Sequence, residues 1–192
     1  MNAMAATSRP LKTADEFMAL GDEVRAELIA GEIFMAPAPT RWHQNVAGNL
    51  YELLAPHART RGRGDASWGT VWIAPLDVHL PSGDIVQPDL IFVRTENWEI
   101  LQDWIRGTPD LLIEIVSPSN AERDRIVKRA LYARNGVSEY WIVDPDVRTV
   151  EVLRLRDGTY EPAGYFGAGT ELVSSVLPDL RLPIDEVFRP AL

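Results

Sequence analysis

The chain has 192 residues, of which 46% are hydrophobic and 24% charged, the balance of one soluble globular domain. It contains no cysteine, which excludes disulfides, a thiolate nucleophile and cysteine-ligated metal centres. Its formal net charge of -9 argues against a protein that coats nucleic acid through a broad basic surface. Because no apolar run could span a bilayer and the first residues lack a secretory signal, we expect a cytoplasmic protein with no membrane contact.

The N-terminal part of the chain predicts a leader followed by a compact domain. We expect residues 1–13 to form a flexible leader and residues 14–192 to form a single domain. Thr40 has the character of a helix N-cap, and apolar residues at helical spacing follow it. The predicted helix carries His43 in its first turn and stops at Pro56.

Short apolar and alternating runs predict most of the remaining structure as strands. We expect strands at residues 27–29, 32–34, 71–80, 85–93, 110–116, 137–143, 150–155 and 159–166. Turn residues predict that the chain reverses at Gly31, at Pro81-Ser82-Gly83-Asp84 and at Asp157-Gly158. Residues 97–106 show a helical face, and a clearer helix opens with the capping-box pattern at 119–122 and closes at Gly136. The core-facing stripe of that second helix is predicted as Ile126, Val127, Ala130 and Leu131. This order of elements is that of an α/β protein.

Two acidic residues, Asp89 and Glu114, stand inside apolar strands. Burial of a carboxylate costs several kcal/mol unless it is paired or binds a cation. Two carboxylates about 4 Å apart at an effective dielectric of 20 would repel by about 4 kcal/mol, a penalty that a divalent cation removes. Structural explanations are open for each residue: Asp89 could cap a turn after Pro88, and Glu114 could pair with Arg94 or Arg134.

The choice of lysine at position 128 is also informative. The chain has 17 arginines but only two lysines, Lys12 and Lys128. A lysine ammonium is a compact charge that suits the orientation of a hydroxide or the stabilisation of a phosphate transition state. The competing interpretation is a helix-surface pair between Asp124 and Lys128 at i,i+4 spacing.

Several segments in order resemble the Uma-two family of the PD-(D/E)XK nuclease superfamily. They are Gln87-Pro88-Asp89-Leu90-Ile91-Phe92-Val93, Leu112-Ile113-Glu114-Ile115-Val116-Ser117-Pro118-Ser119, Asp124-Arg125 with Lys128 and Tyr132, and Gly136-Val137-Ser138-Glu139-Tyr140-Trp141-Ile142-Val143-Asp144-Pro145. The resemblance covers residues 27–188. It implies a three-layer restriction-endonuclease-like fold in which helices flank a mixed, mostly antiparallel central sheet.

The resemblance also implies roles for individual residues. Asp89 and Glu114 would bind Mg²⁺, with Mn²⁺ able to replace it, and the carbonyl of Ile115 would be a further ligand. The superfamily lysine falls at Val116, so Lys128 resembles the lysine that some members supply from the following helix instead.

Two further positions match the family. Glu32 could be an additional acidic ligand, with Glu27 as the competitor for that role. His43 could take part in catalysis or could be an ordinary histidine at a helix N-terminus.

The resulting expectation is a metal-dependent phosphodiester hydrolase, a homodimeric DNA endonuclease. Two alternatives stay open. An inactive binding or accessory module with the same fold would explain Val116 and the acidic charge, and hydrolysis of a small phosphodiester would explain the charge alone. Motifs for phosphate-binding loops, zinc proteases and serine hydrolases do not occur in the sequence.

Overall fold

A computed structural model of the chain describes residues 10–21, 24–60, 67–118 and 121–191. Its helices are α1 (Ala14–Met18), α2 (Arg41–Arg59), the 3₁₀-helix η1 (Thr95–Ile100), the π-helix η2 (Arg123–Lys128), α3 (Arg129–Arg134) and α4 (Ile184–Val187). Its strands are β1 (Ala26–Ile29), β2 (Glu32–Met35), β3 (Gly69–Ile73), β4 (Val78–His79), β5 (Ile85–Val86), β6 (Leu90–Arg94), β7 (Ile105–Arg106), β8 (Leu111–Ile115), β9 (Glu139–Asp144), β10 (Thr149–Arg156), β11 (Thr159–Phe166), β12 (Glu171–Leu172) and β13 (Leu182–Pro183). Most of the predicted leader and the first two residues of the predicted capping box, Ser119 and Asn120, lie outside the described residues.

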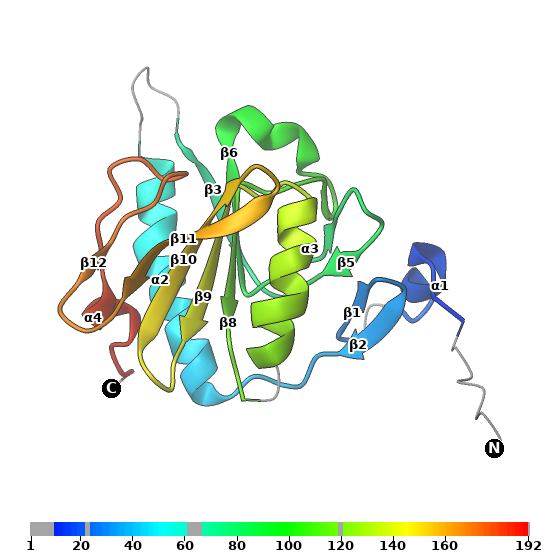
Figure 1. The fold of residues 1–192 in the computed structure, drawn as a ribbon, viewed down its shortest axis with the longest axis horizontal. Coiled ribbons are helices and arrows are strands. Elements are labelled where there is room, and N and C mark those ends of the chain that lie inside the picture. Colours follow the sequence, from blue (N-terminus) through cyan, green and yellow to red (C-terminus); the bar gives the residue numbers. More distant parts are fainter. Residues whose placement is uncertain (1–9, 22–23, 61–66, 119–120, 192) are drawn as a thin grey trace.

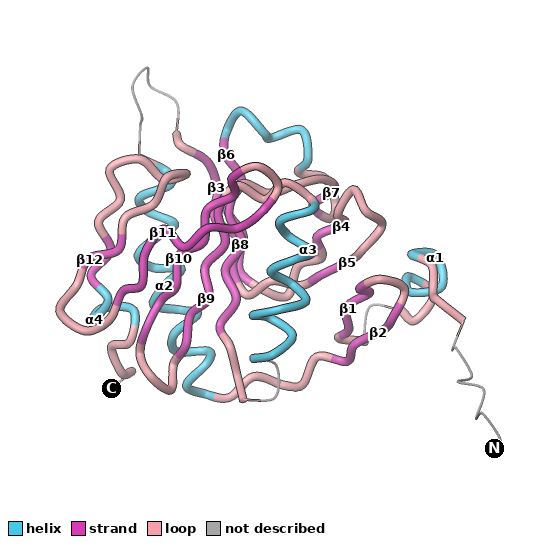
Figure 2. Tube along the Cα trace, viewed as in Figure 1, coloured by secondary structure: helices cyan, strands magenta, loops and turns pink. Residues whose placement is uncertain are grey.

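The centre of the fold is a six-stranded sheet in the order β11-β10-β9-β8-β6-β3 (Figures 1 and 2). Only β8 and β9 run parallel, and the other neighbouring strands are antiparallel. The β10–β11 hairpin turns at Asp157-Gly158, as predicted, with positive φ at both residues. The predicted mixed, mostly antiparallel sheet is therefore confirmed.

A second sheet, in the order β2-β1-β5-β4-β7, lies beside the first. Its β1–β2 hairpin turns at Ala30 and Gly31, whose φ values of 52° and 79° fit a tight turn of the type that matches the twist of paired strands. The β4–β5 hairpin closes over residues 81–84, where Gly83 has a φ of 87°. Both predicted turns are confirmed.

Helices cover both faces of the central sheet, and Figure 1 shows α2 and α3 separated by its strands. On one face, buried residues of α2 such as Leu50 pack against Phe92 of β6. On the other face, Leu131 and Tyr132 of α3 pack against Leu112 of β8. Full burial of such a side chain contributes about 1.5–3 kcal/mol, so the two clusters hold the layers together. Among the described residues, no helix is both long and apolar enough to cross a membrane.

Helix α2 begins as predicted but runs further than predicted. The side chain of Thr40 accepts a hydrogen bond from the backbone N–H of His43 at 3.1 Å, so Thr40 is the N-cap. The predicted stop at Pro56 is wrong, because the helix continues to Arg59. Pro56 is exposed, so the helix carbonyl that it leaves without a partner can bind water, while the buried Ala58 anchors the last turn.

The predicted helix over residues 97–106 is also wrong. This segment forms η1, which ends at Ile100, and then the short strand β7, which pairs in parallel with β4. Ile105 is buried in that strand, whereas Trp98 is 63% exposed. Pairing with a strand more than 20 positions earlier along the chain overrides the local helical pattern.

Candidate active site

A pocket of about 650 Å³ opens where β6 begins and β8 ends. Its walls come from β1, the first turn of α2, the end of β8 and η2. The ionisable side chains that line it are Arg25, Glu27, His43, Asp89, Glu114, Arg123, Asp124 and Lys128. Four carboxylates in one pocket repel one another, so each needs a cation or hydrogen-bond donors nearby.

Asp89 and Glu114 lie side by side because of the strand register. Leu90 of β6 is paired with Ile113 of antiparallel β8, so the next position on each strand brings the two acids together at the mouth of the sheet. One oxygen of Asp89, Oδ2, accepts a hydrogen bond from the backbone N–H of Ile115 at 2.7 Å. This carboxylate therefore ties the two strands together, in place of the turn cap considered from the sequence.

Glu114 is held from the opposite side by α3 and η2. Its Oε1 accepts from Lys128 Nζ at 2.9 Å and from the hydroxyl of Tyr132 at 2.6 Å. Burial raises the pKa of Glu114 well above its usual range, although the charge of Lys128 opposes that rise. The two arginines considered as its partners pair elsewhere, Arg94 with Asp110 and Arg134 with Asp84.

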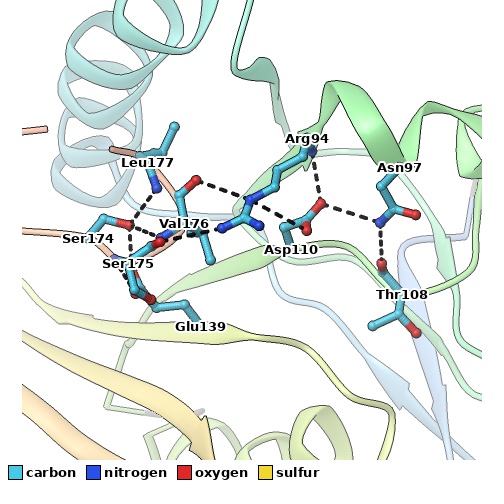
Figure 3. Close-up of polar contacts among 9 residues, drawn as sticks. All are labelled: Arg94, Asn97, Thr108, Asp110, Glu139, Ser174, Ser175, Val176 and Leu177. Carbon is cyan, nitrogen blue, oxygen red and sulfur yellow. Dashed lines mark hydrogen bonds and ion pairs between the residues drawn. The ribbon is translucent and has the colours of Figure 1, made fainter. Parts of the chain in front are cut away.

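Arg94, the last residue of β6, belongs to a polar cluster at the far end of the sheet, five positions after Asp89 of the pocket (Figure 3). There the carboxylate of Glu139, at the start of β9, accepts from Ser174 and from the backbone and hydroxyl of Ser175. Arg94 donates to the backbone carbonyls of Ser175 and Val176. This cluster joins the C-terminal segment to the sheet and is separate from the pocket.

Lys128 stands at the centre of the acidic group. Its Nζ lies 2.8 Å from Glu27, 2.9 Å from Glu114 and 3.6 Å from Asp124. Burial alone would lower the pKa of Lys128, but these carboxylates outweigh burial and raise it. The lysine is therefore charged at neutral pH. Asp124 and Lys128 do meet, but as a buried pair and not on the helix surface.

The orientation of η2 corrects the core stripe predicted for this helix. Ile126 and Val127 are 62% and 40% exposed, and Ala130 is exposed as well, so only Leu131 of that stripe is buried. The inward face of η2 instead carries the ion pair between Asp124 and Lys128. π-Helices are rare in proteins, but those that occur are often found at functional sites. Here the π-helix η2 presents charged side chains to the pocket and aliphatic side chains to solvent.

Among the two acids of the β1–β2 hairpin, the structure brings only Glu27 into the pocket. Glu27 is 3% exposed and accepts from Lys128 and from the backbone N–H of Gln87 at 2.9 Å. Glu32 is exposed, lies opposite Ile29 in the hairpin and does not line the pocket. Burial in the structure separates them, because every residue of β1 is buried whereas Glu32 at the start of β2 is exposed.

His43 reaches the pocket from α2. Its Nε2 lies 3.3 Å from Asp89 Oδ2, while its Nδ1 is buried and has no hydrogen-bond partner among the described residues. Burial alone would lower the pKa of His43, but the hydrogen bond and charge of Asp89, together with the carbonyl of Ile115, raise it above its usual value. His43 is thus coupled to the acid that the sequence predicts as a metal ligand.

The donor set fits a hard divalent cation. The contacts that Asp89 and Glu114 make with described residues use Asp89 Oδ2 and Glu114 Oε1, which leaves the second oxygen of each carboxylate. Ile115, whose backbone carbonyl would be the further ligand, also lines the pocket. Within the described part of the chain, no three His, Asp or Glu side chains form a group that could hold a metal ion. Mg²⁺ needs only one or two carboxylates, because waters and substrate phosphate complete its octahedron.

Comparison with known proteins places the chain in a family. The family model Uma2, described as "putative restriction endonuclease", matches residues 14–185. The chain belongs to the Uma2 family. It is also similar to a solved structure described as a "putative nuclease belonging to DUF820" from Anabaena variabilis ATCC 29413, with 22% identity and a TM-score of 0.74 over 92% of this chain and 97% of that chain. That likeness confirms the predicted fold. No curated protein matches the chain.

Proposed function

We propose that this Uma2 protein is a metal-dependent phosphodiester hydrolase that cleaves DNA internally. The observation that carries the proposal is the pocket in which Asp89, Glu114 and the buried Lys128 meet. The family description and the printed title of the structural relative, which both name a nuclease, support the same activity.

In this proposal Asp89, Glu114 and the carbonyl of Ile115 hold Mg²⁺, and Mn²⁺ can replace it. When bound, the ion supplies polarisation of the phosphate and a water of lowered pKa. The protein contributes the positions of the ligands. The N–H of Ile115 orients Asp89, and Tyr132 together with Lys128 orients Glu114.

Lys128 has two tasks in this arrangement. Its charge opposes the rise that burial causes in the pKa of Glu114, because an opposite charge at hydrogen-bond distance favours the carboxylate. It also provides the cation that Val116 cannot, and so can orient an attacking water beside Glu114. His43, with its raised pKa, can hold a proton at Nε2 against Asp89.

One observation favours a second function, a binding or accessory module without activity. Val116 lies in an apolar cluster at the position of the superfamily lysine, and Lys128 is already engaged by three carboxylates. A protein of this kind would keep the fold and the pocket but would not turn over DNA.

Two substitutions and one matched control test the proposal. Asp89→Asn and Glu114→Gln should each abolish Mn²⁺-dependent nicking of plasmid DNA and weaken Mn²⁺ binding in calorimetric titration, while circular dichroism shows an intact fold. Glu32→Gln removes an acid outside the pocket and should behave like the wild type. Unchanged Mn²⁺ affinity in both site variants would refute the proposed ligands. Mn²⁺ binding without nicking by the wild type would favour the inactive module.

A further inference from the structure

Arg123 lines the pocket and has an unusual environment for a charged side chain. It is the first residue of η2, and its guanidinium lies 5.4 Å from the ring centroid of Phe34 on β2. The side chain is half-buried, and its Nε is fully buried without a hydrogen-bond partner among the described residues. A buried N–H without an acceptor costs free energy, so this group calls for a ligand.

The other cations of η2 are already paired. Arg125, two residues on, forms ion pairs with Asp144 at 2.7 Å and Glu151 at 3.4 Å, and it does not line the pocket. Lys128 is surrounded by carboxylates. Within the described residues, Arg123 forms no ion pair. Its charge is therefore available to a molecule that enters the pocket.

The contact with Phe34 positions Arg123 for such a molecule. An aromatic face attracts a guanidinium through its ring electrons and leaves the N–H groups of the guanidinium free to donate. Arg25, which is exposed and lines the same pocket, adds a second cation that forms no ion pair within the described part of the chain. The pocket thus has an acidic centre and a basic rim on the side of the β1–β2 hairpin.

We propose that Arg123, together with Arg25, forms a binding site for a backbone phosphate of the nucleic acid, next to the phosphate that is cleaved. The planar guanidinium presents paired N–H donors that match two oxygens of a phosphate, and it remains charged at any pH of interest. The inference rests on the proposed nuclease function and describes how the substrate strand is held beside the pocket. It also accounts for binding of a polyanion by a chain with a net charge of -9, because two local cations face the strand.

The test measures DNA binding apart from cleavage. Fluorescence anisotropy of a labelled DNA duplex, in buffer with Ca²⁺ across a series of salt concentrations, gives both the affinity and its salt slope. Arg123→Gln should weaken binding about tenfold or more and reduce the salt slope by about one. Arg123→Lys keeps the charge but loses the planar pair of N–H donors. This variant should therefore keep the salt dependence of binding and lose part of the affinity.

Arg156→Gln is the matched control. Arg156 is exposed at the opposite end of the central sheet, where it forms a long ion pair with Glu161, and it should bind like the wild type. If Arg123→Gln binds with wild-type affinity and slope, the phosphate site is refuted while the nuclease proposal stands. If the wild type binds no DNA, the nuclease proposal fails and the phosphate site fails with it. Equal losses in Arg123→Gln and Arg156→Gln would also refute the site.

Discussion

Replacement of Lys128 by methionine would show how far the acidic pocket depends on one cation. Methionine has similar length but no charge, so Glu27, Glu114 and Asp124 would be left buried without their shared partner. Removal of one member of a buried ion pair typically costs about 3–5 kcal/mol, since the remaining charge stays desolvated. We expect a loss of this size in the free energy of unfolding at pH 8.

The loss should depend on pH in a defined direction. Burial already raises the pKa of Glu114, and without Lys128 that pKa rises further. A carboxyl whose folded pKa lies above its unfolded pKa stabilises the fold at low pH, and it loses this contribution as the pH rises through the folded pKa. The deficit of Lys128→Met should therefore shrink between pH 8 and pH 5. Lys128 itself stays charged throughout that range in the wild type, because its pKa is raised.

Urea denaturation followed by tryptophan fluorescence measures both effects, with Trp141 fully buried as a reporter. The other lysine is a natural control, because Lys12 forms only an exposed pair with Glu16 and Lys12→Met should change stability little. Addition of Glu114→Gln to Lys128→Met should recover part of the loss. This account of the pocket would be refuted if Lys128→Met lost less than about 1 kcal/mol of unfolding free energy at pH 8 and the loss did not depend on pH. Such a loss is far smaller than that expected for a buried ion pair.

Two further substitutions probe single contacts. Burial alone would raise the pKa of Asp84, but hydrogen bonds from Ser82, from a backbone N–H of the β1–β2 turn and from Arg134 lower it. Asp84→Asn should lower the free energy of unfolding by about 2 kcal/mol at pH 7. In thermal melts at a series of pH values, the difference in stability from the wild type should disappear as the pH falls below about 4 and then through the lowered pKa of Asp84. Tyr132→Phe removes a hydrogen bond to the buried Glu114, so it should cost about 1–3 kcal/mol of stability and lower the melting temperature by several degrees. It should also lower kcat for plasmid cleavage about tenfold, with KM nearly unchanged. A change in KM alone would contradict the positioning role of Tyr132.

Local sequence patterns were sufficient for the hairpins and for the two acids of the pocket. The Asp157-Gly158 turn requires positive φ values, which these residue types tolerate, so its position follows from the sequence. Acids inside apolar strands are costly, so Asp89 and Glu114 could be singled out before their partners were known.

Features that depend on distant contacts could not be predicted in this way. Glu27 acquires its place only when β1 packs next to η2, about 100 positions further along the chain. The apolar residues Ile126 and Val127 suggested a core stripe, but the inward side of η2 was already determined by the charges of Asp124 and Lys128. Tyr132 shares that inward side, and its spacing of four residues from Lys128 was a signal for it.

The polar cluster of Figure 3 has a consequence for the order in which this chain can fold. Glu139 is completely buried at the start of a central strand, and only one donor to its carboxylate, the indole N–H of Trp141, is local among the described residues. The other donors lie 35 and 36 positions later, at Ser174 and Ser175. Likewise, the buried Asn49 of α2 donates to the carbonyl of Val187, 138 positions away. Until those late segments arrive, the Glu139 carboxylate lacks most of its donors and the core remains open to water. The domain should consequently fold as one cooperative unit, with slow steps in which distant segments pair. A nascent chain that lacks residues 174–187 should expose an apolar face of the sheet that is prone to aggregation.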